Sequence, residues 1–221
     1  MSENTTPHTA SEYDTNIVKT IPYYNEFHKQ VIDIVKQKNS VTRWLDIGCG
    51  TGTLEQILIR EIPFVKITAI DPSEQMLKEA KDKIDTDKID FICNSSENID
   101  FVEEYDVITA IQVHHYLREK EREKATRNCF RALRQNGYYI SFENVVPDTP
   151  QMLEFELERW KRYQMNNGKT QEEADNHIKR CGKNYYPITV KQHIDLLKQV
   201  GFKQVYVFWK SYMQMGIMGI K

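Results

Sequence analysis

The sequence contains no long apolar run and no excess of charge of one sign. No apolar stretch in the 221 residues approaches the roughly 18–20 residues that a membrane-spanning helix needs. The 30 Lys and Arg residues nearly balance the 32 Asp and Glu residues, which argues against a strongly basic surface for nucleic acid. Residues 1–14 are polar and lack the basic start and apolar core of a secretory signal. These features indicate a cytoplasmic protein.

Cysteine is scarce and scattered. The four cysteines stand at positions 49, 93, 129 and 181, with no C-x-x-C pair and no histidine at zinc-ligand spacing, so no metal site is expected. Reduced thiols are the expectation for a cytoplasmic chain. Cys93 and Cys129 are predicted to be small buried apolar residues. Cys49 differs because it lies inside a glycine loop.

The remaining composition is that of one globular domain, with 40% hydrophobic and 11% aromatic residues. Strand patterns alternate with helix patterns, which predicts an α/β fold with a mostly parallel sheet covered by helices on both faces. The predicted strands are residues 41–47, 65–70, 89–93, 105–111 and 138–144. The predicted helices are residues 17–38, 54–61, one capped by Ser73, 119–134 with Gly137 as its C-cap, 151–182, and one from Thr189 to Gly201.

Two β-rich runs close the chain, at residues 204–209 and 213–220. The few residues between them cannot carry the crossover that parallel neighbours require. The two runs are therefore predicted to form an antiparallel hairpin at the end of the sheet.

A glycine loop follows the first predicted strand and opens a helix. Its glycines, Gly48, Gly50 and Gly52, allow positive φ and let a ligand approach the backbone closely. Asp46 precedes the loop, and its carboxylate would repel a pyrophosphate and attract an ammonium group. The third glycine also comes one residue too early for the dinucleotide fingerprint. The loop therefore points away from a dinucleotide.

A second acidic residue, Asp71, ends the second predicted strand. A carboxylate at that place hydrogen-bonds ribose hydroxyls, a need that all adenosine-containing ligands share. Pro72 and Met76 follow it and can form an apolar wall for an adenine ring. The loop and these residues together predict a site for an adenosine-containing cofactor.

The segments LDIGCGTG, AIDPSEQML, residues 93–97 and YDVITAIQVHHYL resemble the class I S-adenosylmethionine-dependent methyltransferases. The resemblance implies a Rossmann-like seven-stranded sheet with an antiparallel last strand. It implies that Gly48 to Gly52, including Cys49, line the methionine and ribose parts of S-adenosyl-L-methionine, and that Asp71 binds the ribose. It places Ser95 where the family usually holds a carboxylate near adenine; Glu97 lies two residues on, and backbone groups of Ser95 and Ser96 can serve instead.

The outer regions are similar to carboxy-S-adenosylmethionine synthase. The segment IPYYNEF is similar to its helix that places a tyrosine, here Tyr24, over the cofactor. Arg180 aligns with the arginine that holds the extra carboxylate in that enzyme, across a length difference between residues 175 and 189. The GCGTG form of the glycine loop favours a plain methyl donor.

Four segments follow from this interpretation. They are an N-terminal helical flap (1–40), a cofactor-binding core (41–149), a helical lid (150–187), and the final helix and hairpin (188–221). Tyr13, Tyr23 and Tyr24 in the flap are candidates for an aromatic wall around the sulfonium, and they can equally be packing residues.

Catalytic and substrate residues are expected at the carboxyl ends of the strands, where ligands of such sheets bind. His114 and His115, beyond the fourth strand, are the candidate bases, or else line the pocket or pack. Gln112 precedes them and can contact the cofactor through its backbone, and Glu143 can orient a substrate or be a solvated strand end. In the lid region, the candidate substrate contacts are Trp160, Arg180, Tyr185 and Tyr186, with core packing as the alternative for the aromatic ones.

The sequence therefore predicts a cytoplasmic enzyme that transfers a methyl group to a small molecule by in-line displacement, leaving S-adenosyl-L-homocysteine. Two alternatives stay open, a carboxy-S-adenosylmethionine synthase-like enzyme and a non-catalytic S-adenosylmethionine-binding protein. Action on tRNA would require a basic face, of which the balanced charge gives no sign.

Overall fold

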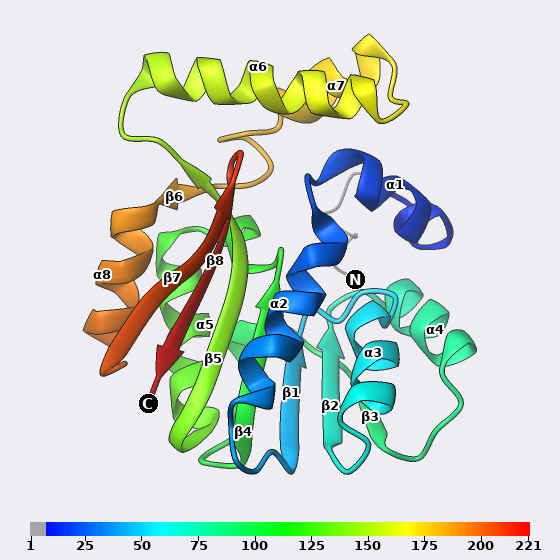
Figure 1. Cartoon of the computed structure of the whole chain (residues 1–221), viewed down its shortest axis with the longest axis vertical. Helices are drawn as coiled ribbons and strands as arrows, with labels where there is room; N and C mark the ends of the chain where they lie inside the picture. The colour runs from blue at the N-terminus through cyan, green and yellow to red at the C-terminus, as the bar shows by residue number, and fades with distance from the viewer. Residues whose placement is uncertain (1–7) are drawn as a thin grey trace.

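The computed structural model describes residues 8–221. One twisted sheet runs through it in the order β3-β2-β1-β4-β5-β8-β7 (Figure 1). Strand β8 is antiparallel to both of its neighbours, while β1 to β5 pair in parallel. The α/β prediction and the terminal antiparallel hairpin are confirmed. The strands are β1 Arg43–Ile47, β2 Lys66–Asp71, β3 Ile89–Cys93, β4 Tyr105–Ile111, β5 Leu133–Val146, β6 Ile188–Thr189, β7 Gln204–Ser211 and β8 Gln214–Ile220.

Helices cover both faces of the sheet (Figure 1). Apolar side chains of α2, α3 and α4 bury one face, and those of α5 and α8 bury the other. The predicted caps are confirmed, because the Ser73 and Thr189 hydroxyls accept hydrogen bonds from the first turns of α4 and α8. The helices are α1 Tyr13–Thr20, α2 Tyr24–Lys36, α3 Thr53–Glu61, α4 Glu74–Lys83, α5 Glu119–Ala132, α6 Pro150–Asn166, α7 Gln171–Ile178 and α8 Val190–Val200, with short 3₁₀ turns at Ala10–Glu12, Ser96–Asn98 and His114–Tyr116.

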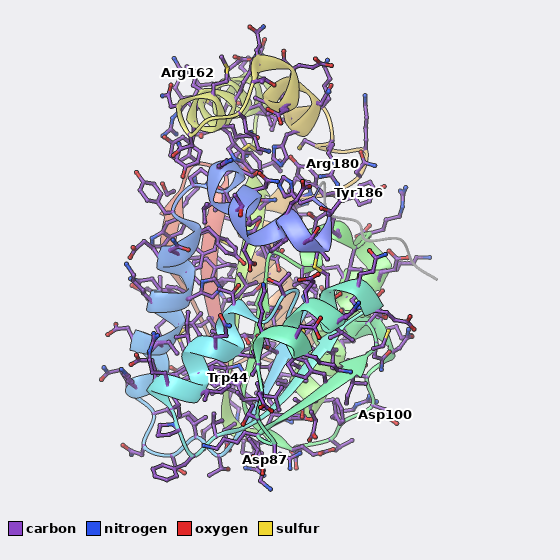
Figure 2. The ribbon with its side chains drawn as sticks, turned by 90° about the vertical axis from the view of Figure 1, so that its right-hand side faces the viewer. Trp44, Asp87, Asp100, Arg162, Arg180 and Tyr186 are labelled. Atoms are coloured by element: carbon purple, nitrogen blue, oxygen red, sulfur yellow. The ribbon has the colours of Figure 1, made fainter. Side chains whose placement is uncertain are left out.

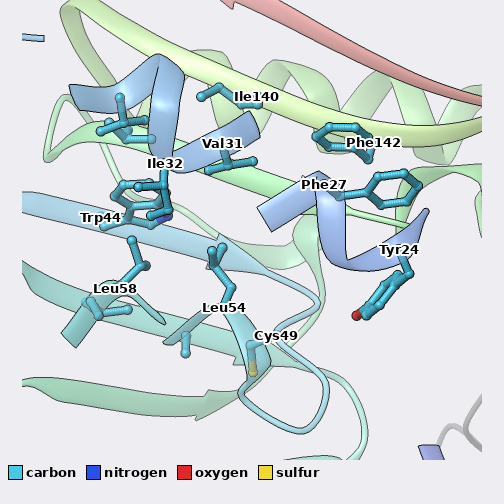
Figure 3. Close-up of a cluster of buried hydrophobic side chains, with 14 of the residues drawn as sticks. Tyr24, Phe27, Val31, Ile32, Trp44, Cys49, Leu54, Leu58, Ile140 and Phe142 are labelled. Carbon is cyan, nitrogen blue, oxygen red and sulfur yellow. The ribbon is translucent and has the colours of Figure 1, made fainter. Parts of the chain in front are cut away.

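The core under α2 is aromatic and tightly packed (Figure 3). Phe27 of α2 stacks on Phe142 of β5 with ring centroids 4.3 Å apart. Trp44 of β1 is fully buried, and its indole N–H donates to the Thr109 hydroxyl at 2.8 Å. Burying each such side chain contributes about 1.5–3 kcal/mol. This packing fixes α2 against the strands whose ends form the site.

Two long helix predictions were wrong in the same way. The segment 17–38 is two helices, because Pro22 lacks an N–H and Tyr23 takes a left-handed φ of 58°. The segment 151–182 is also two helices, which separate at Gly168 with φ of 91°. Both breaks turn the chain over the carboxyl edge of the sheet.

Two smaller predictions were also wrong, and one short strand was missed. Helix α5 ends at Ala132, and Gly137 lies inside β5, where an added Cβ would come within 2.8 Å of the Arg134 carbonyl oxygen. The glycine serves a close backbone approach and not a helix cap. The short strand β6, which pairs with β5, was not anticipated. Cys93 is exposed, whereas Cys129 is buried as predicted.

Helices α6 and α7 lie across the top of the molecule, above α1 (Figure 1). The Trp160 indole N–H donates to the Thr20 carbonyl oxygen at 2.6 Å, and Leu153 and Leu157 pack on the same side of α6. The flap and lid boundaries stay predictions, and residues 1–7 of the flap fall outside the described part. Within residues 8–221, no helix is both long and apolar enough to cross a membrane.

Candidate cofactor site

A cavity of about 520 Å³ opens at the carboxyl ends of β1, β2 and β4. This is the edge where parallel α/β sheets bind their ligands, at the point where the strand order reverses. The volume lies in the range of small-molecule sites, about 300–1,000 Å³. Nine of the residues predicted to bind a cofactor line it: Gly48, Gly50, Asp71, Pro72, Met76, Ser95, Ser96, Glu97 and Gln112.

The glycine loop has the conformation that its sequence predicts. Gly48, Gly50 and Gly52 all have positive φ, at 67°, 56° and 81°. A Cβ added at Gly48 would lie 2.4 Å from Cγ2 of Val113, so Val113 would have to move to admit it. Gly48 is therefore required both by its φ and by close contact with the turn that follows β4.

Asp71 is held rigidly at the end of β2. Its two carboxylate oxygens accept backbone N–H groups from Gly50 at 3.0 Å and Ser73 at 2.8 Å. Burial raises the pKa of Asp71, and these two hydrogen bonds oppose that rise. The glycine loop and the start of α4 thus orient one carboxylate toward the cavity.

Asp46, Cys49 and Tyr24 do not line the main cavity. They line a smaller one of about 20 Å³ that shares Gly48, Gly50 and Tyr13 with it. Asp46 is buried and accepts a hydrogen bond from the Thr109 hydroxyl. Burial raises its pKa to about 6. Asp46 therefore lies beside the cofactor cavity and lines the smaller adjoining cavity.

Tyr13 of α1 lies where three cavities meet. It lines the main cavity, the small cavity beside Asp46, and a third cavity below the lid. Its hydroxyl is a hydrogen-bond partner of the Tyr24 hydroxyl, and burial raises the pKa of both phenols. Tyr23, in contrast, is half exposed and contacts Trp209. Of the three candidate wall tyrosines, Tyr13 and Tyr24 reach the site.

The third cavity is small, about 20 Å³, and shares Tyr13, Gln112 and Tyr116 with the main one. Arg180 and Tyr185 line it, together with residues of α1 and α7. Figure 2 shows Arg180 and Tyr186 below the lid helices, at the level of α1. This cavity adjoins the cofactor cavity on the side of the lid.

Two residues that were predicted to contact the substrate lie outside these three cavities. Trp160 packs the lid onto α1, as the alternative interpretation expected. Tyr186 bonds the Arg118 guanidinium through its hydroxyl at 2.9 Å and lines none of the three cavities. Neither side chain is in position to touch a ligand in this arrangement.

The two histidines after β4 are both buried and point to different places. His114 accepts or donates at Nδ1 with the Tyr139 hydroxyl, 3.0 Å away, and lines an internal cavity of about 10 Å³ between β5 and α8. Burial lowers its pKa. His115 contacts Glu143 through Nδ1 at 2.9 Å and the Asn144 amide through Nε2 at 3.2 Å. Neither ring lines the cofactor cavity.

The Glu143 carboxylate accepts several hydrogen bonds from the turn after β4 and from its own strand. It accepts the backbone N–H groups of His114 and His115, at 3.2 and 2.8 Å, and the Ser141 hydroxyl at 2.7 Å. Burial would raise its pKa, but the hydrogen bond from His115, with the interactions of the neighbouring histidine rings, outweighs burial and brings the pKa to about 2. Glu143 is therefore ionised and holds the turn after β4 in place. It is not a solvated strand end.

The sequence analysis did not predict three residues that lie at the site. Tyr116 lines both the main and the third cavity, Asn144 lines the third, and Glu55 of α3 is fully buried beside Asp46. The position of Tyr116 directly after the two histidines was the available signal. Asn144 directly follows Glu143 at the end of the predicted fifth strand, which was a signal too, whereas Glu55 is brought to the site only by tertiary packing.

Comparisons with known proteins agree with this geometry. A family model described as "Methyltransferase domain" matches residues 45–137. Carboxy-S-adenosyl-L-methionine synthase of Staphylococcus epidermidis is 28% identical, and the match covers 96% of this chain and 94% of that protein.

Two solved structures show the same fold. A protein of Nostoc punctiforme with a provisional O-methyltransferase name superposes with a TM-score of 0.69 at 16% identity, over 96% of this chain and 58% of its own. Phosphoethanolamine N-methyltransferase 2 of Haemonchus contortus, solved with phosphomonomethylethanolamine and S-adenosylhomocysteine, gives 0.64 at 16% identity, over 90% of this chain and 42% of its own.

Proposed function

We propose that the chain is a class I S-adenosylmethionine-dependent methyltransferase, that its main cavity holds S-adenosyl-L-methionine, and that the enzyme methylates a small molecule in the cytoplasm. The observation that carries this is the orientation of Asp71. Its carboxylate is fixed by Gly50 and Ser73 at the rim of a cavity large enough for the cofactor. A fixed acceptor there suits the two ribose hydroxyls.

The other residues of the site contact different parts of the cofactor. Pro72 and Met76 give the adenine ring an apolar wall, and the backbone of Ser95 and Ser96 lies at the same end of the cavity. The glycine loop follows the methionine portion, because its glycines let a ligand approach the backbone. Asp46 attracts the α-ammonium group from the adjoining small cavity.

Bound S-adenosylmethionine supplies a methyl group on a positively charged sulfur, and in-line attack by the acceptor breaks the S–CH₃ bond. The chain's own contribution is placement. Tyr13 and Tyr116 lie between the cofactor cavity and the third cavity, so an acceptor in the third cavity is next to the cofactor. Such positioning can contribute about 7–11 kcal/mol of barrier lowering.

The acceptor cavity is nearly closed. Its volume of about 20 Å³ accommodates about one water molecule. Helix α1 and the lid roof it and are joined by the Trp160 to Thr20 hydrogen bond. We therefore propose that α1 and the lid separate to admit the acceptor and close to exclude water.

The role of His115 follows from its contacts. Both ring nitrogens have protein partners, so His115 does not reach the acceptor directly. Asn144 does line the acceptor cavity, and its amide lies between His115 and the Gln214 amide N–H, which donates at 3.0 Å. We propose that His115 positions Asn144, which in turn orients the acceptor.

A second candidate is formation of carboxy-S-adenosylmethionine. It is favoured by the relative that bears this name and matches this chain over nearly its whole length. Arg180 is the residue that would hold the added carboxylate, and it lines the third cavity next to the cofactor cavity.

Mass spectrometry of small molecules released from the purified protein distinguishes these functions. Methyl transfer predicts S-adenosylmethionine or S-adenosylhomocysteine as the released ligand, and transfer of labelled methyl to an acceptor pool. A carboxylated cofactor, lost from an Arg180→Gln variant and kept in a Lys183→Gln control, would establish the second candidate. Cofactor binding without transfer to any acceptor would favour a non-catalytic binding protein.

A further inference from the structure

Glu55 of α3 is a fully buried carboxyl group with no role in the account above. Its side chain is fully buried, and its own backbone N–H is the one backbone donor that acts on its carboxyl group within residues 8–221. Its side chain is also a hydrogen-bond partner of the Asp46 carboxyl group. Two ionised carboxylates can only accept hydrogen bonds, so this contact requires a proton on one of them.

Within the described part of the chain, no Lys or Arg lies against the pair. The groups that face it are Tyr24 and His28 from α2, Cys49 from the glycine loop, Asp71 from β2 and the Thr109 hydroxyl from β4. Burial lowers the pKa of His28 to about 4, so its imidazole is neutral at physiological pH. Two negative charges in such a site would be strongly unfavourable, and one proton is retained.

We propose that Glu55 is a neutral carboxylic acid that donates its proton in a hydrogen bond to Asp46, and thereby keeps Asp46 ionised for the α-ammonium group of the cofactor. Glu55 is in this sense a positioning residue, since it acts through Asp46. The inference rests on the proposed function, which supplies the ammonium ligand.

The unequal surroundings decide which carboxyl carries the proton. Asp46 has a second donor, the Thr109 hydroxyl, and it borders the small cavity beside the glycine loop. Glu55 has neither. Burial raises the pKa of both groups, and the Asp46 charge raises that of Glu55 further. The negative charge therefore resides on Asp46, where an ammonium group can reach it.

Two matched variants test this. Glu55→Gln keeps a hydrogen-bond donor without a titratable proton, whereas Glu55→Met keeps length and apolar packing and removes the donor. Dissociation constants for S-adenosylhomocysteine are measured by calorimetry from pH 5 to 9. We expect Glu55→Gln to bind within about threefold of the unsubstituted protein at each pH. We expect Glu55→Met to bind at least tenfold more weakly at pH 7 and to recover at higher pH, because Asp46 then ionises only there.

A second measurement does not depend on the cofactor. The infrared spectrum at pH 7.5 should contain the carbonyl stretch of one buried protonated carboxylic acid, and Glu55→Gln should remove it. A spectrum without that band, or equal pH profiles for the two variants, would overturn the role of Glu55. Absence of binding by the unsubstituted protein would instead overturn the proposed function, and the infrared band would still show whether Glu55 is protonated.

Discussion

Asp14 and Thr51 join the N-terminal helix to the glycine loop. The Thr51 hydroxyl donates to one carboxylate oxygen of Asp14, and the Lys83 ammonium group of α4 contacts the other. These contacts hold α1, and with it Tyr13, over the cofactor cavity. We expect α1 to slow the exit of a bound cofactor on this side of the cavity.

Replacing Asp14 with alanine should therefore speed cofactor dissociation. Asp14 and Lys83 are partly exposed, but Thr51 is buried and loses a hydrogen bond to a charged acceptor, so folding stability should fall by about 1–2 kcal/mol. We expect the dissociation rate of S-adenosylhomocysteine to rise about three- to tenfold in stopped-flow measurements. Asp33→Ala, an exposed acid on α2, is the matched control and should leave the rate unchanged. Equal rates for both variants would show that α1 does not close the cavity.

Gly48→Ala should affect both folding and binding. The variant has a positive φ and brings a Cβ within 2.4 Å of Val113, so we expect a loss of about 2–4 kcal/mol in the free energy of unfolding. Gly168→Ala is the control for φ alone, because no atom lies within 4 Å of its added Cβ. It should cost about 1–2 kcal/mol. Urea unfolding measures both values.

The contact with Val113 can be tested separately. A Gly48→Ala/Val113→Ala double variant relieves the overlap, so its loss should be smaller than the sum of the two single losses. Strictly additive losses would mean that φ strain, and not the approach to the turn after β4, makes Gly48 necessary.

His28 should make the fold sensitive to mild acid. Burial lowers its pKa from 6.5 to about 4, so below pH 6.5 the unfolded chain binds a proton that the folded chain does not. The free energy of unfolding should therefore fall as the pH drops from 6.5 to 4, by up to about 1.4 kcal/mol per pH unit from this residue. In urea unfolding measured over this pH range, His28→Leu should reduce the slope by the contribution of one bound proton. An unchanged slope would contradict a neutral buried imidazole.

The cofactor half of the site was predictable because its chemistry lies in short segments. Asp71 ends β2 and the three loop glycines lie between β1 and α3, and parallel strands place such residues at one edge. Their φ angles and hydrogen bonds agree with what the local sequence requires. No long-range information was needed to find them.

The acceptor half depends on contacts between distant segments. The position of Tyr13 at three cavities follows from docking of α1 on the glycine loop, and Glu55 meets Asp46 only after α3 packs on β1. Gly137 was misassigned because a helix-capping rule cannot detect that β5 begins directly at Leu133. Sequence periodicity reports which face of an element is buried, but not which partner covers it.

The most direct test is calorimetric titration of the purified protein with S-adenosylmethionine, S-adenosylhomocysteine and NAD, alongside Asp71→Ala. We predict micromolar binding of both adenosyl-sulfur ligands and none of NAD. We also predict at least tenfold weaker binding in the variant, because hydrogen bonds to a charged acceptor contribute about 1.5–3 kcal/mol each. Absence of binding by either adenosyl ligand, or equal affinity in Asp71→Ala, would contradict the assignment of this cavity to S-adenosylmethionine.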